Sequence, residues 1–210
     1  LRFHDLFEEE TTEEIYQSSG ISTVVVDEDE ILSGNIFRSI RARTPWLFIT
    51  LIGEFIAVNV GNHFDHTLQA LPIIAIFMPL LAGLGGNIGT QSITLMVRGL
   101  STGQITVSSA MHHILREACI GFFIGTIFGV LVTLVCWGWQ HSKALGAVVG
   151  LAMAINMTIA TIIGTFTPFA LKAMKVDPAV ASGPVIATTI DVLGLAIYFT
   201  LVSTFLIKVM

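Results

Sequence analysis

The chain has 210 residues, of which 53% are hydrophobic and only 12% are charged. Soluble domains carry about 25% charged residues, so this composition excludes an ordinary soluble domain. The mean hydropathy of +0.81 points the same way. The net charge of −5 is concentrated at one end, because ten of the fifteen acidic residues precede residue 31. No basic cluster indicates nucleic-acid binding.

The first 44 residues differ in composition from the rest. Residues 1–20 have the pattern of a soluble domain's end running into a short helix, and residues 27–30 are four consecutive acids. Residues 34–44 form a basic, amphipathic approach to a membrane. We therefore divide the chain at residues 20 and 44, into a soluble remnant, a connecting helix at 21–44 and a membrane part at 45–210. Because the chain begins with Leu1 and not Met, we expect it to belong to a longer protein.

Five long apolar runs follow, each sufficient to cross a bilayer core of about 30 Å. We predict spans near 45–62, 69–99, 110–137, 145–171 and 180–208. The predicted fold class is an all-α membrane protein with five transmembrane helices.

Most basic residues lie at the span ends on one side of the membrane. Seven lie on that side: Arg38, Arg41, Arg43, Arg98, Arg116, Lys172 and Lys175. The other side has only Lys143 and Lys208. By the positive-inside rule we expect a cytoplasmic N-terminus and an external C-terminus.

Asp191 is the most unusual residue of the predicted spans. It lies roughly 18 Å into the fifth span, near the middle of the bilayer. An ionised Asp at that depth costs several kcal/mol unless it meets a cation or a water-filled cavity. No Lys or Arg lies at a matching depth in any predicted span. We therefore expect a bound cation, and the alternative is a protonated or hydrogen-bonded core Asp.

The same helix supplies further candidate ligands. Gly183, Ala187 and Asp191 recur at i, i+4 and i+8 and therefore share one face. Two of the three are small, which leaves space for a hydrated ion beside backbone carbonyls. Thr188 is adjacent and offers a hydroxyl. The alternative for Gly183 and Ala187 is ordinary packing of small residues between helices.

A second polar insertion interrupts the second span between residues 83 and 100. Gly85 lies about 20 Å from the cytoplasmic edge, counting back from Arg98, and so matches the depth of Asp191. Glycines beside neutral oxygens such as that of Asn87 suit a hard cation that keeps its water shell. The alternative is a packing notch for a neighbouring helix.

Four further polar residues of the spans receive an interpretation. Glu54 either lines an external approach to a pore or is protonated and hydrogen-bonded, and the sequence does not separate these alternatives. We expect Asn156 and Thr158 to form hydrogen bonds between helices, and Glu117 to have a structural role.

Two long motifs resemble one known family. The run PLLAGLGGNIGTQSITLMVRGLSTG, residues 79–103, resembles the second helix of the MgtE magnesium channels. The run DPAVASGPVIATTIDVLGLAIYF, residues 177–199, resembles their fifth helix, which holds the pore aspartate. The opening EEETTEEIYQSSG is similar to the end of the family's tandem CBS domain, and IFRSIRARTPWL to its connecting-helix junction.

This resemblance implies a homodimer with five transmembrane helices per subunit and one pore at the subunit interface, lined by the second and fifth helices. Asp191 takes the role of the pore aspartate that holds a largely hydrated Mg²⁺, with Ala187 and Gly183 on the same face. Some family members have a polar side chain where Gly183 stands. Residues 1–20 are then the end of a cytoplasmic CBS-type domain.

We therefore predict a passive, inward Mg²⁺ channel, with Mn²⁺, Co²⁺ and Ni²⁺ as further candidate cargo. The alternative is a proton- or sodium-coupled divalent-cation carrier that uses Asp191 as its protonatable switch. An intramembrane aspartyl protease needs two membrane aspartates and only Asp191 is available, so we predict no enzymatic activity. The expected partners are a second copy, divalent cations and the lipid bilayer of the cell inner or plasma membrane, and not nucleic acid.

Overall fold

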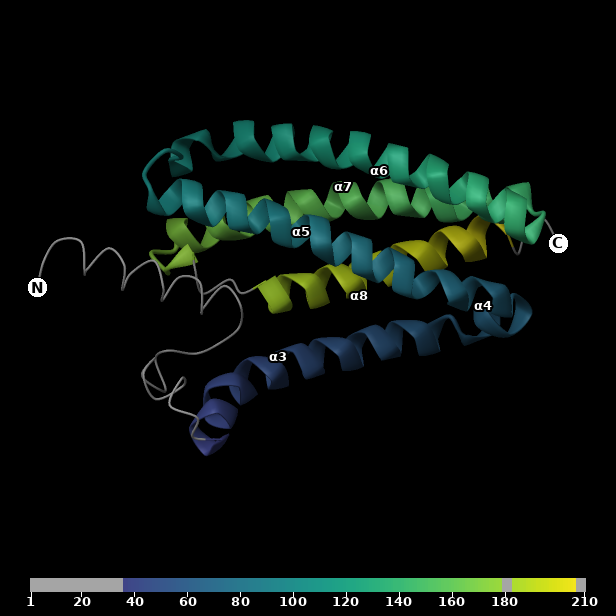
Figure 1. Ribbon diagram of the computed structural model, residues 1–210, viewed down its shortest axis with the longest axis horizontal. Helices are drawn as coiled ribbons and strands as arrows, with labels where there is room; N and C mark the ends of the chain where they lie inside the picture. The colour runs from purple at the N-terminus through teal and green to yellow at the C-terminus, as the bar shows by residue number, and fades with distance from the viewer. Residues whose placement is uncertain (1–35, 179–182, 207–210) are drawn as a thin grey trace, which may run out of the picture.

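The computed structural model describes residues 36–178 and 183–206 (Figure 1). Its elements are α3 (Ile36–His63), α4 (Asp65–Ala70), the 3₁₀ helix η1 (Pro72–Phe77), α5 (Met78–Ser101), the 3₁₀ helix η2 (Val107–Ser109), α6 (Ala110–Gln140), α7 (Lys143–Ala173) and α8 (Gly183–Phe205). The predicted soluble remnant at 1–20 and most of the predicted connecting helix at 21–44 lie outside the described residues.

Within the described ranges, five helical segments are long and apolar enough to cross a membrane. They are Ile36–His63, Pro72–Ser101, Val107–Trp139, Lys143–Ala173 and Gly183–Phe205. The all-α fold class with five candidate spans is therefore confirmed.

Three helices form the centre of the bundle. Helices α5, α7 and α8 all contact one another, α6 packs against α7, and α3 packs against α8. Figure 1 shows α6 and α3 on opposite sides of this central group. Large apolar side chains on α3 and α6, such as Phe48, Phe55 and Phe123, are exposed on the outside. This distribution matches helices that face lipid.

The first two spans differ in detail from their predicted bounds. Helix α3 is continuous from Ile36 to His63, so residues 36–44 extend the first span without a break. The second predicted span begins at residue 69, but an extended residue, Leu71 (φ −135°, ψ 72°), interrupts the helix there. Pro72 follows, and a proline disfavours the helical conformation of the residue before it. The span therefore begins at Pro72 as a 3₁₀ helix and continues as α5.

Small residues bring α6 and α7 close together in antiparallel register. A Cβ atom added at Gly125 would lie 2.9 Å from Ala154 Cα, and one at Gly129 would meet the carbonyl of Gly150. Thr133 donates from its hydroxyl to the carbonyl oxygen of Gly146 at 2.9 Å. Because three successive turns are matched in this way, the register of the α6–α7 contact is well defined.

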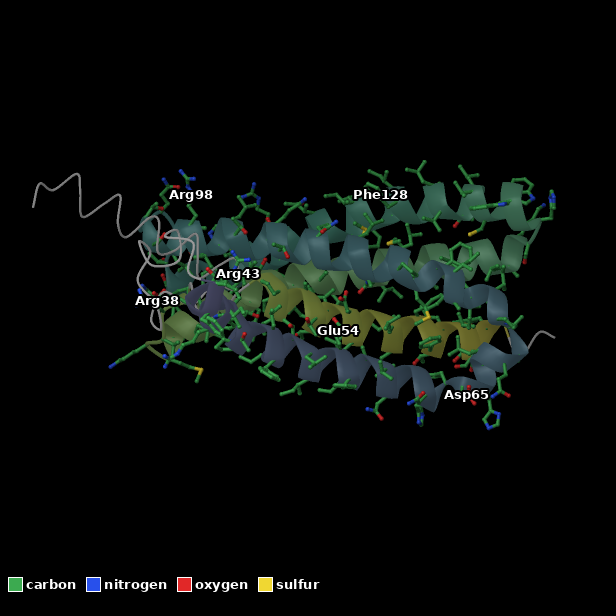
Figure 2. The ribbon with its side chains drawn as sticks, turned by 60° about the horizontal axis from the view of Figure 1, so that its bottom comes forward. Arg38, Arg43, Glu54, Asp65, Arg98 and Phe128 are labelled. Atoms are coloured by element: carbon green, nitrogen blue, oxygen red, sulfur yellow. The ribbon has the colours of Figure 1, made fainter. Side chains whose placement is uncertain are left out.

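The ends of the bundle differ in charge. Figure 2 shows Arg38, Arg43 and Arg98 at one end and Asp65 at the other. Lys172 lies in the last turn of α7, at the end where α5 also finishes. Lys143 begins α7 at the opposite end, with its ammonium group 4.6 Å from the centre of the Trp137 ring. The predicted charge asymmetry is therefore present between the two ends of the folded bundle.

Candidate cation site

Asp191 lies in α8 with a half-buried side chain. Its Oδ1 atom is fully buried and has no hydrogen-bond partner among the described residues. A Cβ atom added at Gly86 of α5 would lie 3.8 Å from that oxygen. An unpaired carboxylate oxygen is costly when buried, because it has lost the water that would solvate it. The arrangement therefore calls for a donor or a cation from outside the described residues.

The backbones of α5 and α8 approach closely at this point. The added Cβ at Gly86 would lie 3.4 Å from the Cβ of Ala187, at ordinary van der Waals distance. Ala187 is half-buried, whereas Gly183 is buried at the start of α8. The structure thus places Ala187 beside Asp191 on the side of α8 that faces α5.

Gly85 and Asn87 lie on either side of Gly86 and point in other directions. A Cβ at Gly85 would lie 2.5 Å from Asn156 Nδ2 and 3.1 Å from Ile190 Cγ2, so Gly85 serves the packing of α5 on α7 and α8. Asn87 is exposed on the surface of the single chain.

Asn87 belongs to a row of exposed residues that we call the polar stripe of α5. These residues recur at helical spacing along one face. The polar stripe consists of Gly83, Asn87, Gln91, Thr94 and Arg98.

Helix α3 brings a second carboxylate to Asp191. A Cβ at Gly53 would contact the Thr188 side chain, which seats this part of α3 on α8. Glu54 is exposed, and its carboxyl group lies close enough to Asp191 for the two negative charges to interact. Figure 2 shows Glu54 midway along the bundle. No hydrogen bond within the described ranges involves Glu54, so those residues do not support the alternative of a hydrogen-bonded core acid.

The predicted interhelical hydrogen bond of Asn156 is confirmed. Asn156 is 1% exposed, and its Nδ2 donates to the carbonyl oxygen of Leu81 on α5 at 2.9 Å. The same prediction is wrong for Thr158, whose hydroxyl donates to Ala154 within α7. Thr188 likewise donates within its own helix, to Pro184 at 2.9 Å, because a Thr hydroxyl in a helix reaches the carbonyl one turn earlier.

The site offers few ligands for a cation, and those ligands are oxygen atoms. In the part of the chain that the structure describes, no group of three or more His, Cys, Asp or Glu side chains is placed to hold a metal ion. The acidic side chains at this level are the carboxylates of Glu54 and Asp191, among the described residues. Such a set suits a cation that keeps most of its water, because water supplies the remaining ligands.

The role of Gly86 and the interaction of the Glu54 and Asp191 charges were not predicted. Gly86 is directly adjacent to the predicted Gly85, and successive helical residues differ by only about 100° around the axis. The sequence contains no signal that distinguishes these neighbours. For Glu54, the matching depth in two different spans was an available signal.

Comparisons with known proteins agree on one family. The MgtE family, described as divalent cation transporters, matches residues 78–201. The magnesium transporter MgtE of Bacillus subtilis (strain 168) is 38% identical over 164 residues, which cover 78% of this chain and 36% of that protein. Magnesium transporters MgtE of Enterococcus faecalis and Thermus thermophilus are 34% and 31% identical, over 90% and 93% of this chain. The chain spans 36–43% of the length of these relatives.

Proposed function

Because this chain belongs to the MgtE family of divalent cation transporters, we propose that it forms the membrane-spanning part of a magnesium channel with Asp191 as its central cation site. The family assignment and the five apolar helices make it a multi-pass membrane protein. The observation that carries the proposal is the buried Oδ1 of Asp191, which no donor in the described ranges satisfies.

A hydrated Mg²⁺ ion supplies what this oxygen lacks. Mg²⁺ dehydrates reluctantly and holds its water molecules in octahedral geometry. Those water molecules are hydrogen-bond donors, so the ion can bind the half-buried carboxylate of Asp191 through its hydration shell while neutralising the charge. The small residues Gly86 and Ala187 keep bulky side chains away from this oxygen. The site then selects for charge and for the size of a hydrated ion.

Glu54 strengthens the preference for a divalent ion. Two carboxylates at one level repel each other when both are ionised. One doubly charged cation between them relieves this repulsion more than one singly charged cation does. The membrane potential drives passive inward movement with about 2.3 kcal/mol per charge per 100 mV, and Mg²⁺ carries two charges.

A second copy of the chain completes the path. The polar stripe of α5 is exposed in the single chain although it lies within a candidate span. Polar groups facing lipid are costly, and polar surfaces at membrane depth are tolerated where they line water or protein. A homodimer with its two-fold axis beside α5 and α8 would cover the stripe and enclose a wet pore between the subunits.

Orientation and cargo follow from the same reasoning. The end of the bundle rich in Arg and Lys would face the cytoplasm, with the N-terminus inside and the C-terminus outside a plasma membrane. The site chemistry suits Mg²⁺ because this ion gives up its hydration shell reluctantly. Mn²⁺, Co²⁺ and Ni²⁺ are cargo to be tested beside it.

The test is Mg²⁺ influx into liposomes that contain the purified protein, driven by a potassium diffusion potential. Asp191→Asn should reduce influx roughly tenfold or more, since 1.4 kcal/mol of lost interaction already changes an equilibrium about tenfold. Asp65→Asn is the matched control. Asp65 lies at the end of the bundle opposite Arg98, and its carboxylate accepts a hydrogen bond from Gln69. Unchanged Mg²⁺ influx in a folded Asp191→Asn protein would refute the proposal.

A further inference from the structure

We infer that the chain holds a second, separate cation site, for one dehydrated Na⁺ ion, where α5, α6 and α7 meet. Its ligands are the carboxylate of Glu117 and the hydroxyls of Ser92 and Thr165. The inference does not depend on the proposed function, because these residues are not ligands of the Asp191 site and all three belong to one chain.

A buried acid is the first element of this site. Glu117 of α6 is 7% exposed, and Ser92 of α5 is 2% exposed. The Ser92 hydroxyl donates to Glu117 Oε2 at 2.9 Å. A carboxylate can accept several hydrogen bonds, and within the described ranges this is the only one that Glu117 receives.

Thr165 of α7 lies opposite Glu117. One turn toward the centre of α6, Gly121 contacts the side chain of Thr161. One turn toward the end, the His113 ring stacks on that of Phe169 with centroids 6.2 Å apart. Glu117 and Thr165 are each four residues from both neighbours, so the antiparallel register places them together between two observed contacts.

The hydroxyl of Thr165 is available for a ligand. Thr165 is 0% exposed, and its Oγ1 has no hydrogen-bond partner in the described parts of the chain. Other threonines of α7 behave differently: Thr158 donates to Ala154 and Thr167 to Ile163, each one turn back. An unpaired buried hydroxyl is unfavourable, and it lies where a carboxylate also lacks partners.

In the described parts of the chain, no basic side chain forms an ion pair with Glu117. Arg116 precedes it but is exposed, and His113 lies one turn away against Phe169. No ion pair within the described ranges includes Glu117. An isolated buried carboxylate is strongly unfavourable, so it needs a cation or a proton. A cation also satisfies the Thr165 oxygen, because it binds oxygen lone pairs.

Charge and space favour a monovalent ion. One Na⁺ neutralises one carboxylate, whereas a divalent ion would leave an uncompensated positive charge in a buried site. Mg²⁺ also requires an octahedral shell that usually includes several waters. The helices leave little room for that shell, because a Cβ added at Gly164 would lie 3.2 Å from Ser92 Cβ. Na⁺ loses its water at lower cost and accepts irregular oxygen ligands.

This site is distinct from the Asp191 site. Ser92 follows Gly86 by six residues on α5, which is about 9 Å toward the Arg98 end. The two sites therefore share α5 but use different neighbouring helices, α6 and α7 in one case and α8 in the other. Bound Na⁺ would fasten α5 to α6 and α7.

The test measures thermal unfolding of the purified protein in detergent as NaCl replaces choline chloride at constant ionic strength. Na⁺ should raise Tm saturably, by about 3–6 °C at tenfold the dissociation constant, and K⁺ should raise it less. Glu117→Gln should abolish the Na⁺-specific rise. Asp65→Asn, the same chemical change at an exposed position, should retain it.

The hydroxyl ligand is tested by a matched pair. Thr165→Val should weaken apparent Na⁺ affinity roughly tenfold, because it removes one of the oxygen atoms that bind the ion. Thr165→Ser should restore it. This pair also decides the matter if Glu117→Gln does not fold.

Three results would overturn the inference. They are the absence of a Na⁺-specific rise in the parent protein, an equal rise in Glu117→Gln, and a Tm that depends on pH but not on Na⁺. The last result would mean that a proton occupies the carboxylate.

Discussion

Two adjacent glycines on α5 have opposite surroundings. Gly85 is enclosed by the Asn156 amide and the Ile190 side chain, so any added atom would overlap them. Gly86 faces Ala187 and Asp191 with ordinary contact distances, so a methyl group fits there. Gly85 therefore serves close packing, whereas Gly86 has room for one methyl group beside the carboxylate.

This contrast predicts different effects of the same substitution. Gly85→Ala should lower the free energy of unfolding by about 1–3 kcal/mol, because overpacking forces a rearrangement. Gly86→Ala should leave it unchanged or raise it by up to about 1 kcal/mol, because Ala favours helix. Gly86→Ala should nevertheless reduce Mg²⁺ influx, because the methyl group crowds the carboxyl group of Asp191.

Unfolding in mixed micelles and liposome influx measure the two effects on the same proteins. The interpretation fails if Gly86→Ala conducts like the parent, or if Gly85→Ala is the variant that keeps its stability.

At the scale of elements, α7 holds α5 and α8 together. Its Asn156 donates to the Leu81 carbonyl of α5 and also packs against Gly194 of α8, where a Cβ would lie 2.6 Å from Asn156 Oδ1. Tyr198 of α8 adds a hydrogen bond to the Ile74 carbonyl of η1 at 2.9 Å. These contacts set the position of α8, and therefore of Asp191, relative to α5.

We expect Asn156→Ala to destabilise the bundle by about 1–3 kcal/mol. The loss combines an interhelical hydrogen bond, which contributes roughly 0.6–1.7 kcal/mol in membrane proteins, with a cavity at the contact of three helices. The matched control is Asn59→Ala, since Asn59 is exposed and donates only to Phe55 within α3.

Chemical unfolding of both variants in the same micelles provides the comparison. Equal stabilities of Asn156→Ala and Asn59→Ala would show that the Asn156 contacts do not fix the helices.

At the scale of the whole molecule, the polar stripe of α5 is exposed, whereas α3 and α6 expose many large apolar side chains, such as Phe55 and Phe123. A lipid bilayer can cover those apolar side chains at no cost. It cannot solvate the stripe, and so the proposed second copy is expected on the side of α5.

A cross-linking experiment tests this arrangement. In a protein carrying Cys119→Ser and Cys136→Ala, Gln91→Cys should form covalent dimers with a short bismaleimide in membranes. Phe128→Cys on α6 should form few, because Phe128 lies on the outer surface of that helix. Dimers from Phe128→Cys at equal or higher yield would place the interface elsewhere.

Several features of the site were predictable from composition and spacing. Asp191 could be predicted from the sequence, because a single acid within a long apolar run is costly wherever its helix packs. Asn156 is visible for the same reason, as a buried amide needs a partner. Glu117 was predicted to be structural, and its hydrogen bond to Ser92 agrees with such a role while also leaving the carboxylate incompletely paired.

Other features depended on contacts between distant segments. Glu54 and Asp191 are more than 130 residues apart in the chain, and only the packing of α3 on α8 brings their charges together. The approach of Thr165 to Glu117 likewise follows from the α6–α7 register. Helical periodicity describes the faces of one helix and does not say which face meets which neighbour.

The sequence alone determined the five apolar helices, the charge asymmetry of their ends and the presence of an acid at membrane depth, because each is a local property of a run of residues. The tertiary structure decided which glycine lies against Asp191, which carboxylate interacts with it and which oxygen atoms lack a hydrogen-bond partner. These are properties of packed surfaces, since an oxygen is left without a partner only when the neighbouring helices have taken their places.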